Sequence, residues 1–384
     1  MKRRHVVHVL TVADSLIFIN TLVEKAQERG FEVTVVTSPD QRLGDFGRRL
    51  GVRVVPLEMP RRVTPLGDWV ALNALHRLFE RLRPDIVHSH TPKGGLLGTL
   101  AAHAAQVPVR IYHMRGLAFV TQRGAMRALL KSTELLSCSA ATRVICQSHS
   151  LRSAALEDRL VSAEKSEVVL QGSNGVDSDQ RFDPARFLGR REALRAEWKV
   201  PPKGVVFAFV GRLVRDKGLP ELVEAFERLA RTSAGAVLVL AGPWEARDPV
   251  PAETRRRIDS HPRIMVLGPV AEPAAIYAAS DVVVLPSHRE GFPNVPLEAA
   301  AMERPVVSTR VAGCSDAVAD GQTGLLVEVA DVPALEGAMR RYLEDTALRQ
   351  KHGLAGRQRV VRDFRRENVA NALVDVYLRE LSRI

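Results

Sequence analysis

The segment GVVFAFVGRLVRDKGLPELVEAFERLARTSAGAVLVLAGP, residues 204–243, contains the repeating unit from which the chain is built. An apolar run ends at Gly211, a basic turn leads into an amphipathic helix, and a second apolar run follows. Parallel strands need a crossover of a dozen or more residues, usually a helix. Strands buried on both faces are almost continuously apolar. The segment therefore predicts a βαβ unit of a doubly wound sheet.

The same alternation extends over the rest of the chain in both directions. Strands are predicted in the first half at 5–12, 31–38, 52–58, 85–90, 107–114, 141–148 and 166–172, and in the second half at 204–211, 236–243, 264–270, 281–287, 305–311 and 324–329. Helical patterns occur at 15–30, 69–84, 95–106, 219–231, 273–280 and 295–304, and the chain is largely helical beyond residue 329.

We predict an α/β chain of two doubly wound, Rossmann-like domains that face each other across a cleft. The predicted N-terminal domain spans 1–178 and the C-terminal domain 179–364, with a C-terminal helix at 365–384 that returns to the N-terminal domain. A polar stretch without periodicity, 174–187, is interpreted as the linker. Folds of this type bind ligands beyond the carboxyl ends of their strands.

Composition excludes several classes of protein. The 384 residues are 46% hydrophobic and 26% charged, which fits a globular protein and neither a disordered nor a fibrous one. Three cysteines are too few for a disulfide framework and are expected to be buried in a reducing compartment. Aromatic residues make up 5%, and no nucleic-acid-binding motif is present, so nucleic acid is not an expected partner despite a net charge of +11.

The basic excess lies mainly in the first half, where residues 1–190 carry 27 Lys and Arg against 18 Asp and Glu. Segment 114–136 mixes apolar residues with Arg115, Arg123, Arg127 and Lys131. Such a mixture suits a surface of anionic lipid. The alternative is an ordinary helix with its apolar face in the core and its cations in water.

No segment reaches the roughly 18 consecutive apolar residues of a membrane-spanning helix. The first apolar run contains two histidines and stops at Asp14, which indicates a strand rather than a signal peptide. The expected location is cytoplasmic, peripheral to the inner face of the cell membrane.

Two glutamates, Glu290 and Glu298, follow a predicted strand within segment 288–327. Glu290 is expected in the turn after the strand and Glu298 in the first turn of the next helix, so both face one crevice. Free N–H groups at the start of that helix favour a phosphate. Carboxylates can accept hydrogen bonds from sugar hydroxyls. The alternative is that Glu298 caps the helix and Glu290 is a solvated loop acid.

Two cations, Arg212 and Lys217, lie in the turn between a strand and a helix. Together they could hold a diphosphate, Arg212 by its planar fork and Lys217 as a point charge. The alternative is two solvated loop cations. An Asp-x-Asp pattern at Asp177 and Asp179, which could hold a metal, lies in the predicted linker and is not expected to bind one.

Taken together, these motifs resemble those of the retaining glycosyltransferases of family 4, which have the GT-B fold. The resemblance lies in GRLVRDKG (211–218), EGFPNVPLE (290–298) and AGCSDAVADGQTGLLV (312–327) of the second half. In the first half, HSHTPKGGLLGTLAA (88–102), RIYHMRGL (110–117) and QGSNGVD (171–177) are similar to the bacterial branch that builds capsules and lipid-linked oligosaccharides.

The resemblance covers nearly the whole chain and implies metal-independent transfer of a hexosyl or N-acetylhexosaminyl group from a nucleotide diphosphate, with UDP the expected nucleotide. The expected acceptor is a hydroxyl of a lipid-linked or polysaccharide precursor. Rival interpretations are a soluble acceptor, a nucleotide-sugar epimerase on the same fold, and, ranked lowest, a basic nucleic-acid-binding protein.

The resemblance also implies roles for individual residues. Glu290 would contact the hydroxyls of the donor sugar, Glu298 would hold the ribose, and Arg212 and Lys217 would neutralise the leaving diphosphate. The residues expected to approach the phosphates through their backbone are Gly211, Gly291, Phe292, Pro293, Asn294 and Val295.

On the first domain, the family commonly places a histidine near the reaction centre, and RIYHMRG offers His113, with Arg115 as the alternative. His88 and His90 end the preceding strand and are expected on the acceptor side with Arg115. The loop after the first strand, Ala13-Asp14-Ser15, lacks the glycine that is frequent in the family.

Overall fold

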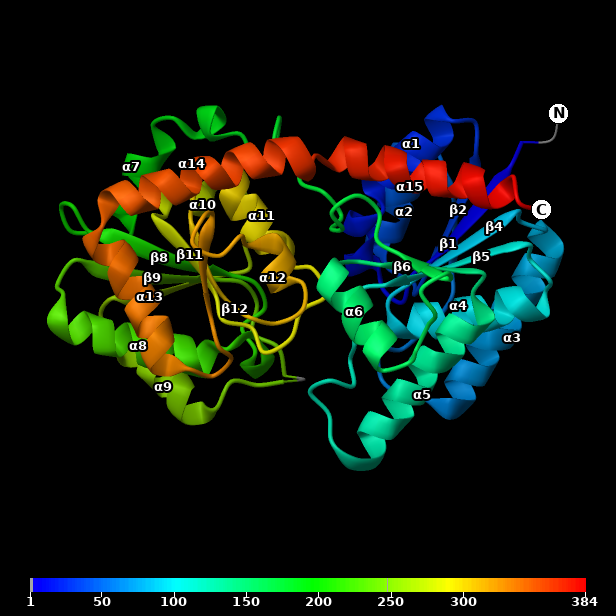
Figure 1. Cartoon of the computed structure of the whole chain (residues 1–384), viewed down its shortest axis with the longest axis horizontal. Helices are drawn as coiled ribbons and strands as arrows, with labels where there is room; N and C mark the ends of the chain where they lie inside the picture. The colour runs from blue at the N-terminus through cyan, green and yellow to red at the C-terminus, as the bar shows by residue number, and fades with distance from the viewer. Residues whose placement is uncertain (1–2, 247) are drawn as a thin grey trace. The chain divides into compact units, whose positions relative to one another are not determined.

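The computed structural model describes residues 3–246 and 248–384, and the chain divides into two compact units (Figure 1). One unit comprises 1–175 together with 366–384, and the other comprises 176–365. The division therefore falls at 175/176 and 365/366, compared with 178/179 and 364/365 in the prediction. The C-terminal helix α15 (Arg366–Leu381) belongs to the first unit.

The N-terminal unit contains a seven-stranded parallel sheet in the order β3-β2-β1-β4-β5-β6-β7. Its strands are β1 (His5–Val9), β2 (Glu32–Thr37), β3 (Arg53–Pro56), β4 (Ile86–His90), β5 (Val109–Met114), β6 (Arg143–Cys146) and β7 (Ser166–Glu167). The connections are the 3₁₀ helix η1 (Ala13–Phe18) and the helices α1 (Asn20–Glu28), α2 (Gln41–Leu50), α3 (Pro65–Leu82), α4 (Pro92–Ala104), α5 (Gly124–Ala140) and α6 (His149–Glu157).

Both faces of this sheet are covered, because consecutive strand residues point to opposite sides. Val6 packs in one apolar cluster with residues of α1 and α15, whereas Val7 packs in another with residues of α3 and α4. A third cluster joins β5 and β6 to Cys138 of α5. The three cysteines are buried and free, as expected.

The C-terminal unit contains a six-stranded parallel sheet in the order β10-β9-β8-β11-β12-β13. Its strands are β8 (Val205–Val210), β9 (Ala236–Ala241), β10 (Ile264–Gly268), β11 (Val282–Leu285), β12 (Val306–Thr309) and β13 (Gly324–Val327). Its helical segments are η2 (Pro184–Phe187), α7 (Arg190–Glu197), η3 (Arg215–Lys217), α8 (Leu219–Thr232), α9 (Ala252–Ser260), α10 (Pro273–Ala279), α11 (Asn294–Ala301), α12 (Cys314–Ala317), α13 (Val332–Glu344) and α14 (Thr346–Asp363).

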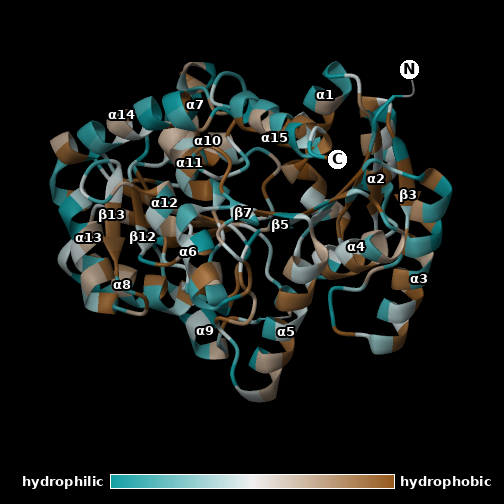
Figure 2. Cartoon of the chain, turned by 45° about the vertical axis from the view of Figure 1, so that its right-hand side comes forward, coloured by the Kyte–Doolittle hydropathy of each residue, from teal (hydrophilic) through white to brown (hydrophobic). Residues whose placement is uncertain are grey.

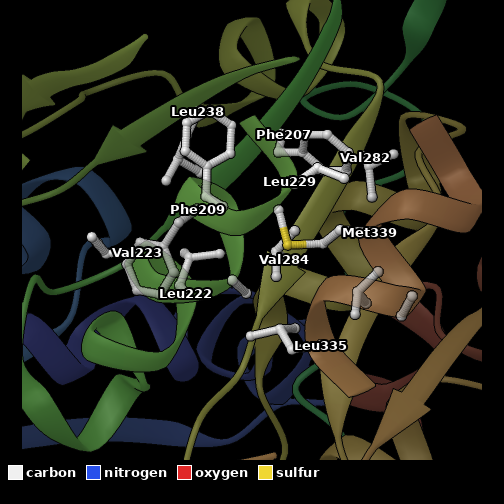
Figure 3. Close-up of a cluster of buried hydrophobic side chains, with 14 of the residues drawn as sticks. Phe207, Phe209, Leu222, Val223, Leu229, Leu238, Val282, Val284, Leu335 and Met339 are labelled. Carbon is white, nitrogen blue, oxygen red and sulfur yellow. The ribbon is translucent and has the colours of Figure 1, made fainter. Parts of the chain in front are cut away.

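The largest core cluster of this unit lies between the sheet and helices α8 and α13 (Figure 3). Phe207 and Phe209 of β8 pack with Leu222 of α8 and with Met339 of α13. The strands are the most continuously hydrophobic elements and the outer helices are mixed (Figure 2). The predicted pair of doubly wound, Rossmann-like α/β domains is confirmed.

Several element boundaries differ from the prediction. The helix expected at 15–30 is divided into η1 and α1, and the strand expected at 166–172 is reduced to β7. Segment 174–187 includes η2, and Val176 already pairs with the C-terminal unit, donating from its N–H to the carbonyl of Phe364 at 2.8 Å.

Five helices, α2, α6, α7, α9 and α12, have no predicted counterpart, and the composition of two of them explains why. Helix α2 contains Gly44 and Gly47, which are poor helix formers, yet a Cβ on Gly47 would lie 2.8 Å from the Val54 side chain. Close packing on β3 therefore explains that glycine. Helix α9 is mostly charged and buries just Thr254 and Ile258, so it lacks an apolar stripe.

Candidate active site

The carboxyl edge of the C-terminal sheet brings together the loops that follow β8, β9, β11 and β12, because parallel strands end on the same side. Close backbone packing defines this edge. A Cβ on Gly242, after β9, would lie 1.8 Å from the carbonyl oxygen of Gly211, after β8. Both glycines have positive φ values near 150°, a region that other residues rarely adopt.

Lys217 and Glu290 form the centre of this edge. Gly218, with a φ of 73°, packs so tightly on β11 that a Cβ would lie 2.0 Å from the carbonyl oxygen of Pro286. This contact places Lys217 beside Glu290, and the two side chains form an ion pair with little solvent exposure. Ser287 Oγ donates to Glu290 Oε1 at 2.8 Å. The two predicted motifs, whose residues Lys217 and Glu290 are 73 positions apart in the sequence, therefore meet at one carboxylate.

The start of α11 lies next to this pair. Asn294 is the first residue of α11, Pro293 precedes it, and no side chain caps the helix. The Gly313 loop packs against the approach to α11, since a Cβ on Gly313 would lie 2.3 Å from the carbonyl oxygen of Gly291. Asn294 Oδ1 is buried without a hydrogen-bond partner among the described residues. Uncapped N–H groups and the helix dipole favour an anion here.

Glu298 is the fifth residue of α11 and lies just past its first turn, whereas the prediction placed it within that turn. Tyr277 Oη of α10 donates to Glu298 Oε2 at 2.9 Å. Tyr277 is completely buried, and burial together with the Glu298 charge raises its pKa well above the usual value. The tyrosine therefore stays a hydrogen-bond donor that orients the carboxylate.

Arg212 is directed to a different partner. Its guanidinium is half exposed and donates to Glu245 at 2.8 Å, in the loop after β9. Phe292 and Pro293 are buried, and Val295 is partly buried, at the start of α11. The assigned roles of these residues in donor binding stay predictions.

The carboxyl ends of β1, β4 and β5 in the N-terminal unit carry a buried histidine cluster that consists of His8, His88, His90 and His113. His8 Nδ1 and His90 Nε2 share a hydrogen bond at 3.1 Å, and His88 Nε2 and His113 Nδ1 share one at 3.2 Å. His88 Nδ1 also lies 2.6 Å from Tyr377 Oη of α15. The cluster ties the C-terminal helix to the sheet.

Arg115 contacts the histidine cluster at its edge. Its Nη2 lies 3.2 Å from His90 Nδ1, and its Nη1 donates to Gln147 Oε1 at 3.0 Å and to Asn174. Burial lowers the pKa of His8 to about 3, and burial with the neighbouring histidines and Arg115 lowers the pKa values of His88, His90 and His113 well below 6.5. All four imidazoles are therefore neutral near pH 7.

The ring nitrogens of His8, His88 and His90 lie within 4.8 Å of one another, a spacing that could hold a metal ion. The guanidinium of Arg115 next to His90 would repel such an ion. The ring nitrogens of His88 and His90 and the Nδ1 of His8 already have hydrogen-bond partners, and His8 Nε2 has none among the described residues. At the Asp-x-Asp pattern, which was not expected to bind a metal, Asp177 Oδ1 accepts from the Gln180 N–H at 3.0 Å and Asp179 pairs with Arg365 at 3.3 Å.

Between His113 and Arg115, the histidine is buried and the arginine is half-buried. His88 and His90 have no exposed surface. A role of the histidines in acceptor binding or catalysis would therefore act through Arg115. These roles stay predictions.

The sequence analysis did not identify two residues of the cluster, His8 and Tyr377. His8 could have been found from the histidine in HVVHV, whereas no local pattern marks Tyr377, which lies 289 residues from its partner His88.

The basic segment 114–136 differs from the prediction in part. Arg115 lies in the polar network described above and not on the surface, and Lys131 pairs with Asp158 at 2.5 Å. Arg123 and Arg127 are exposed, as are the apolar residues Val120, Met126 and Leu129. The prediction that all four cations share one surface is therefore wrong for Arg115. Among the described residues, no helix has the length and apolar composition to cross a bilayer.

Comparisons with known proteins agree with this arrangement. Residues 17–172 match the family model described as "Glycosyl transferase 4-like domain", and residues 204–345 match "Glycosyl transferases group 1". The capsular polysaccharide biosynthesis glycosyltransferase CapM of Staphylococcus aureus is 30% identical over 377 residues, which cover 98% of this chain and 97% of CapM.

A second relative is the UDP-Gal:alpha-D-GlcNAc-diphosphoundecaprenol alpha-1,3-galactosyltransferase of Escherichia coli, 28% identical over 291 residues, 75% of this chain and 74% of the relative. Among solved structures, Anabaena Alr3699/HepE in complex with UDP-glucose has a TM-score of 0.80 at 19% identity and covers 98% of this chain and 99% of that chain. The fold, the sites at the carboxyl ends of the strands and these matches together identify the chain as a glycosyltransferase. The chain belongs to the family 4-type GT-B glycosyltransferases of capsule and lipid-linked glycan synthesis.

Proposed function

We propose that the protein transfers a hexosyl or N-acetylhexosaminyl group from a UDP-sugar to a hydroxyl of a lipid-linked glycan precursor, with retention of anomeric configuration. The observation that carries the proposal is the Lys217–Glu290 pair beside the uncapped start of α11. The names of two relatives support it: one acts from UDP-Gal on a diphosphoundecaprenol-linked sugar, and the other is bound to UDP-glucose. Retention is proposed from the family resemblance.

In this proposal each group of the C-terminal edge has a separate task. The N–H groups at the start of α11 bind the diphosphate, and Lys217 neutralises the charge that develops as the sugar leaves. Glu290 accepts hydrogen bonds from the sugar hydroxyls, and Glu298, oriented by Tyr277, accepts them from the ribose. Because the Lys217 cation neutralises the leaving diphosphate in this proposal, no divalent metal is required.

Nucleotide binding tests the proposal. In excess chelator, titration of the protein with UDP should show binding, and Glu298→Gln should weaken it about tenfold to a hundredfold, because a hydrogen bond to a charged group contributes roughly 1.5–3 kcal/mol. Glu253→Gln, an exposed acid of α9, is the matched control and should bind as the parent does. Unchanged affinity in a folded Glu298→Gln variant would refute the ribose role, and binding that requires magnesium would refute metal independence.

Product analysis separates the rival activities. Incubation with UDP-sugar and a lipid diphosphate acceptor should yield UDP and a longer glycan, with the anomeric configuration of the donor. An altered sugar still attached to UDP would indicate an epimerase, and turnover with a soluble sugar acceptor alone would indicate the soluble-acceptor alternative.

We further propose that the N-terminal unit binds an anionic membrane through the starts of α3 and α5. Both helices follow strands of one sheet and therefore begin at its carboxyl edge. Each packs against α4, and Figure 1 shows them on the same side of this unit. Leu66 and Trp69 of α3 are 84% and 65% exposed, and Met126 and Leu129 of α5 are also exposed. Exposed apolar side chains on both helices, together with the exposed Arg123 and Arg127 near the start of α5, suit a lipid headgroup layer.

Vesicle binding measures this interaction. We expect binding to phosphatidylglycerol vesicles that weakens as salt rises, because the charges are exposed and screened. Removing two charges in Arg123→Gln/Arg127→Gln should weaken binding about thirtyfold, at about 1 kcal/mol per residue. The matched control is Arg77→Gln/Arg81→Gln, two exposed arginines nearer the other end of α3. Equal loss in both double variants, or no binding at low salt, would contradict the assignment.

A further inference from the structure

The opposite edge of the C-terminal sheet contains a basic cavity that is separate from the nucleotide site. The cavity has a volume of about 470 Å³, and its lining includes Arg191, Asp281, Arg304, Thr346, Arg349 and Gln350. Asp281 directly precedes β11 and Arg304 precedes β12, so both lie at the amino ends of strands whose carboxyl ends lead to Glu290 and Gly313. The cavity therefore belongs to the other side of the sheet.

The acidic residues of the cavity already have partners. Asp281 accepts from Arg191 at 2.5 Å and from Arg195 at 2.8 Å. The second acid of the lining, Glu303, lies 3.8 Å from Arg357. Three arginines line the cavity against two acids, and Arg195 adds a further positive charge through Asp281. The lining is therefore net positive.

Arg349 and Arg191 are also satisfied, and this makes Arg304 unusual. Arg349 donates to the carbonyls of Tyr342 and Leu343 at the turn before α14, and Arg191 donates to the carbonyls of Ala278 and Ser280. For Arg304, by contrast, no side-chain hydrogen bond or ion pair is found within residues 3–246 and 248–384, and its Nε is buried without a partner.

The Nε of Arg304 has lost water without gaining an acceptor, and this is costly for a charged group. Burial, followed by the charge of Arg191, lowers the pKa of Arg304 to about 10, which leaves it charged near pH 7. A planar guanidinium fork matches the oxygens of a phosphate. A volume of this size is in the range of small-molecule pockets, roughly 300–1,000 Å³, and exceeds what one phosphate fills.

We propose that this cavity, with Arg304 as its anchor, is a second ligand site that binds the phosphate group of a phosphorylated small molecule. Leu354, which is exposed, and Pro305 in the lining would contact the organic part of the ligand. Free phosphate and a sugar phosphate share the chemistry that Arg304 recognises, so the experiment compares them. The proposal does not depend on the donor-site assignment, because the two sites lie at opposite ends of the same strands.

Thermal unfolding of the full chain with inorganic phosphate and with glucose 6-phosphate tests the site. In phosphate-free buffer, R304Q should melt at or above the temperature of the parent, because an unpaired buried charge has been removed. Both probes should raise the melting temperature of the parent by mass action, the sugar phosphate at lower concentration, and should no longer raise that of R304Q. R304K, which keeps the charge but loses the fork, should respond at higher probe concentrations.

R256Q, which removes an exposed arginine of α9, is the matched control and should respond to both probes as the parent does. A lower melting temperature of R304Q in phosphate-free buffer would show that Arg304 is a structural residue and would overturn the proposal. The proposal would also be overturned if the probes still raised the melting temperature of R304Q but not that of Lys217→Ala, because the anion would then bind at the proposed nucleotide site.

Discussion

Replacing Lys217 with alanine is expected to lower kcat about 10²–10³-fold while the protein remains folded. The cation pairs with Glu290, four residues before α11, near the proposed position of the diphosphate, whose charge grows as the bond to the sugar breaks. Removing one preorganised group that stabilises developing charge typically costs about 2.7–4 kcal/mol of transition-state stabilisation. Glu290 keeps its hydrogen bond from Ser287 in the variant, so the carboxylate is not left without a partner.

Steady-state kinetics with a UDP-sugar and a lipid-linked acceptor measure this effect. Arg215→Ala is the matched control, because Arg215 lies in the same 3₁₀ turn but is exposed and directed to Asp248. Its kcat should stay within a few-fold of the parent. A Lys217→Ala enzyme with parental kcat would contradict the proposed role, and a loss of equal size in Arg215→Ala would point to disruption of the turn instead.

The fold was predictable because its signal is repeated. Each buried parallel strand is a continuous apolar run, and the helices between them carry apolar stripes, so thirteen strands could be located from local sequence. The order of the strands in each sheet follows from no local pattern. Helix α9 has almost no apolar face, and α2 is interrupted by glycines whose reason lies in packing on β3.

The proposed nucleotide site at the carboxyl edge of the C-terminal sheet was predictable for a related reason. Lys217 and Glu290 each follow a strand of a parallel sheet, and such strands deliver their following loops to one edge. Their direct pairing, and the contact of Tyr277 with Glu298, depend on helix positions that the sequence does not display. Arg115 was misplaced because it was grouped with Arg123 and Arg127, which are exposed, whereas its partners Gln147 and Asn174 are distant in sequence.

The histidine cluster predicts strong acid sensitivity of the N-terminal unit. A histidine whose pKa is lowered in the folded state is neutral there, while the unfolded chain takes up a proton below about pH 6.5. Its contribution to stability is therefore complete above that pH and is lost as the pH falls toward the folded value, which is about 3 for His8. His88, His90 and His113 shift in the same direction.

Each such histidine can remove up to about 1.4 kcal/mol of the free energy of unfolding per pH unit, so four together reach about 5 kcal/mol per unit. Domains are typically stable by about 5–15 kcal/mol. His288 acts in the opposite sense in the other unit, because its hydrogen bond with Glu221 raises its pKa and its contribution is lost as the pH rises. Four buried imidazoles outweigh one partly exposed ion pair, and we expect a steep loss of stability between pH 6.5 and pH 5.

Urea unfolding followed by circular dichroism at pH 7.5, 6.5 and 5.5 measures this dependence. His8→Gln removes one titrating group whose Nε2 has no partner among the described residues, and it should make the pH dependence shallower by about one proton. His103→Gln changes an exposed histidine of α4 and should leave the slope as in the parent. Equal stability of the parent at pH 7.5 and 5.5 would contradict this prediction. It would show that the histidines are protonated in the folded protein without loss of the contacts between the cluster and α15.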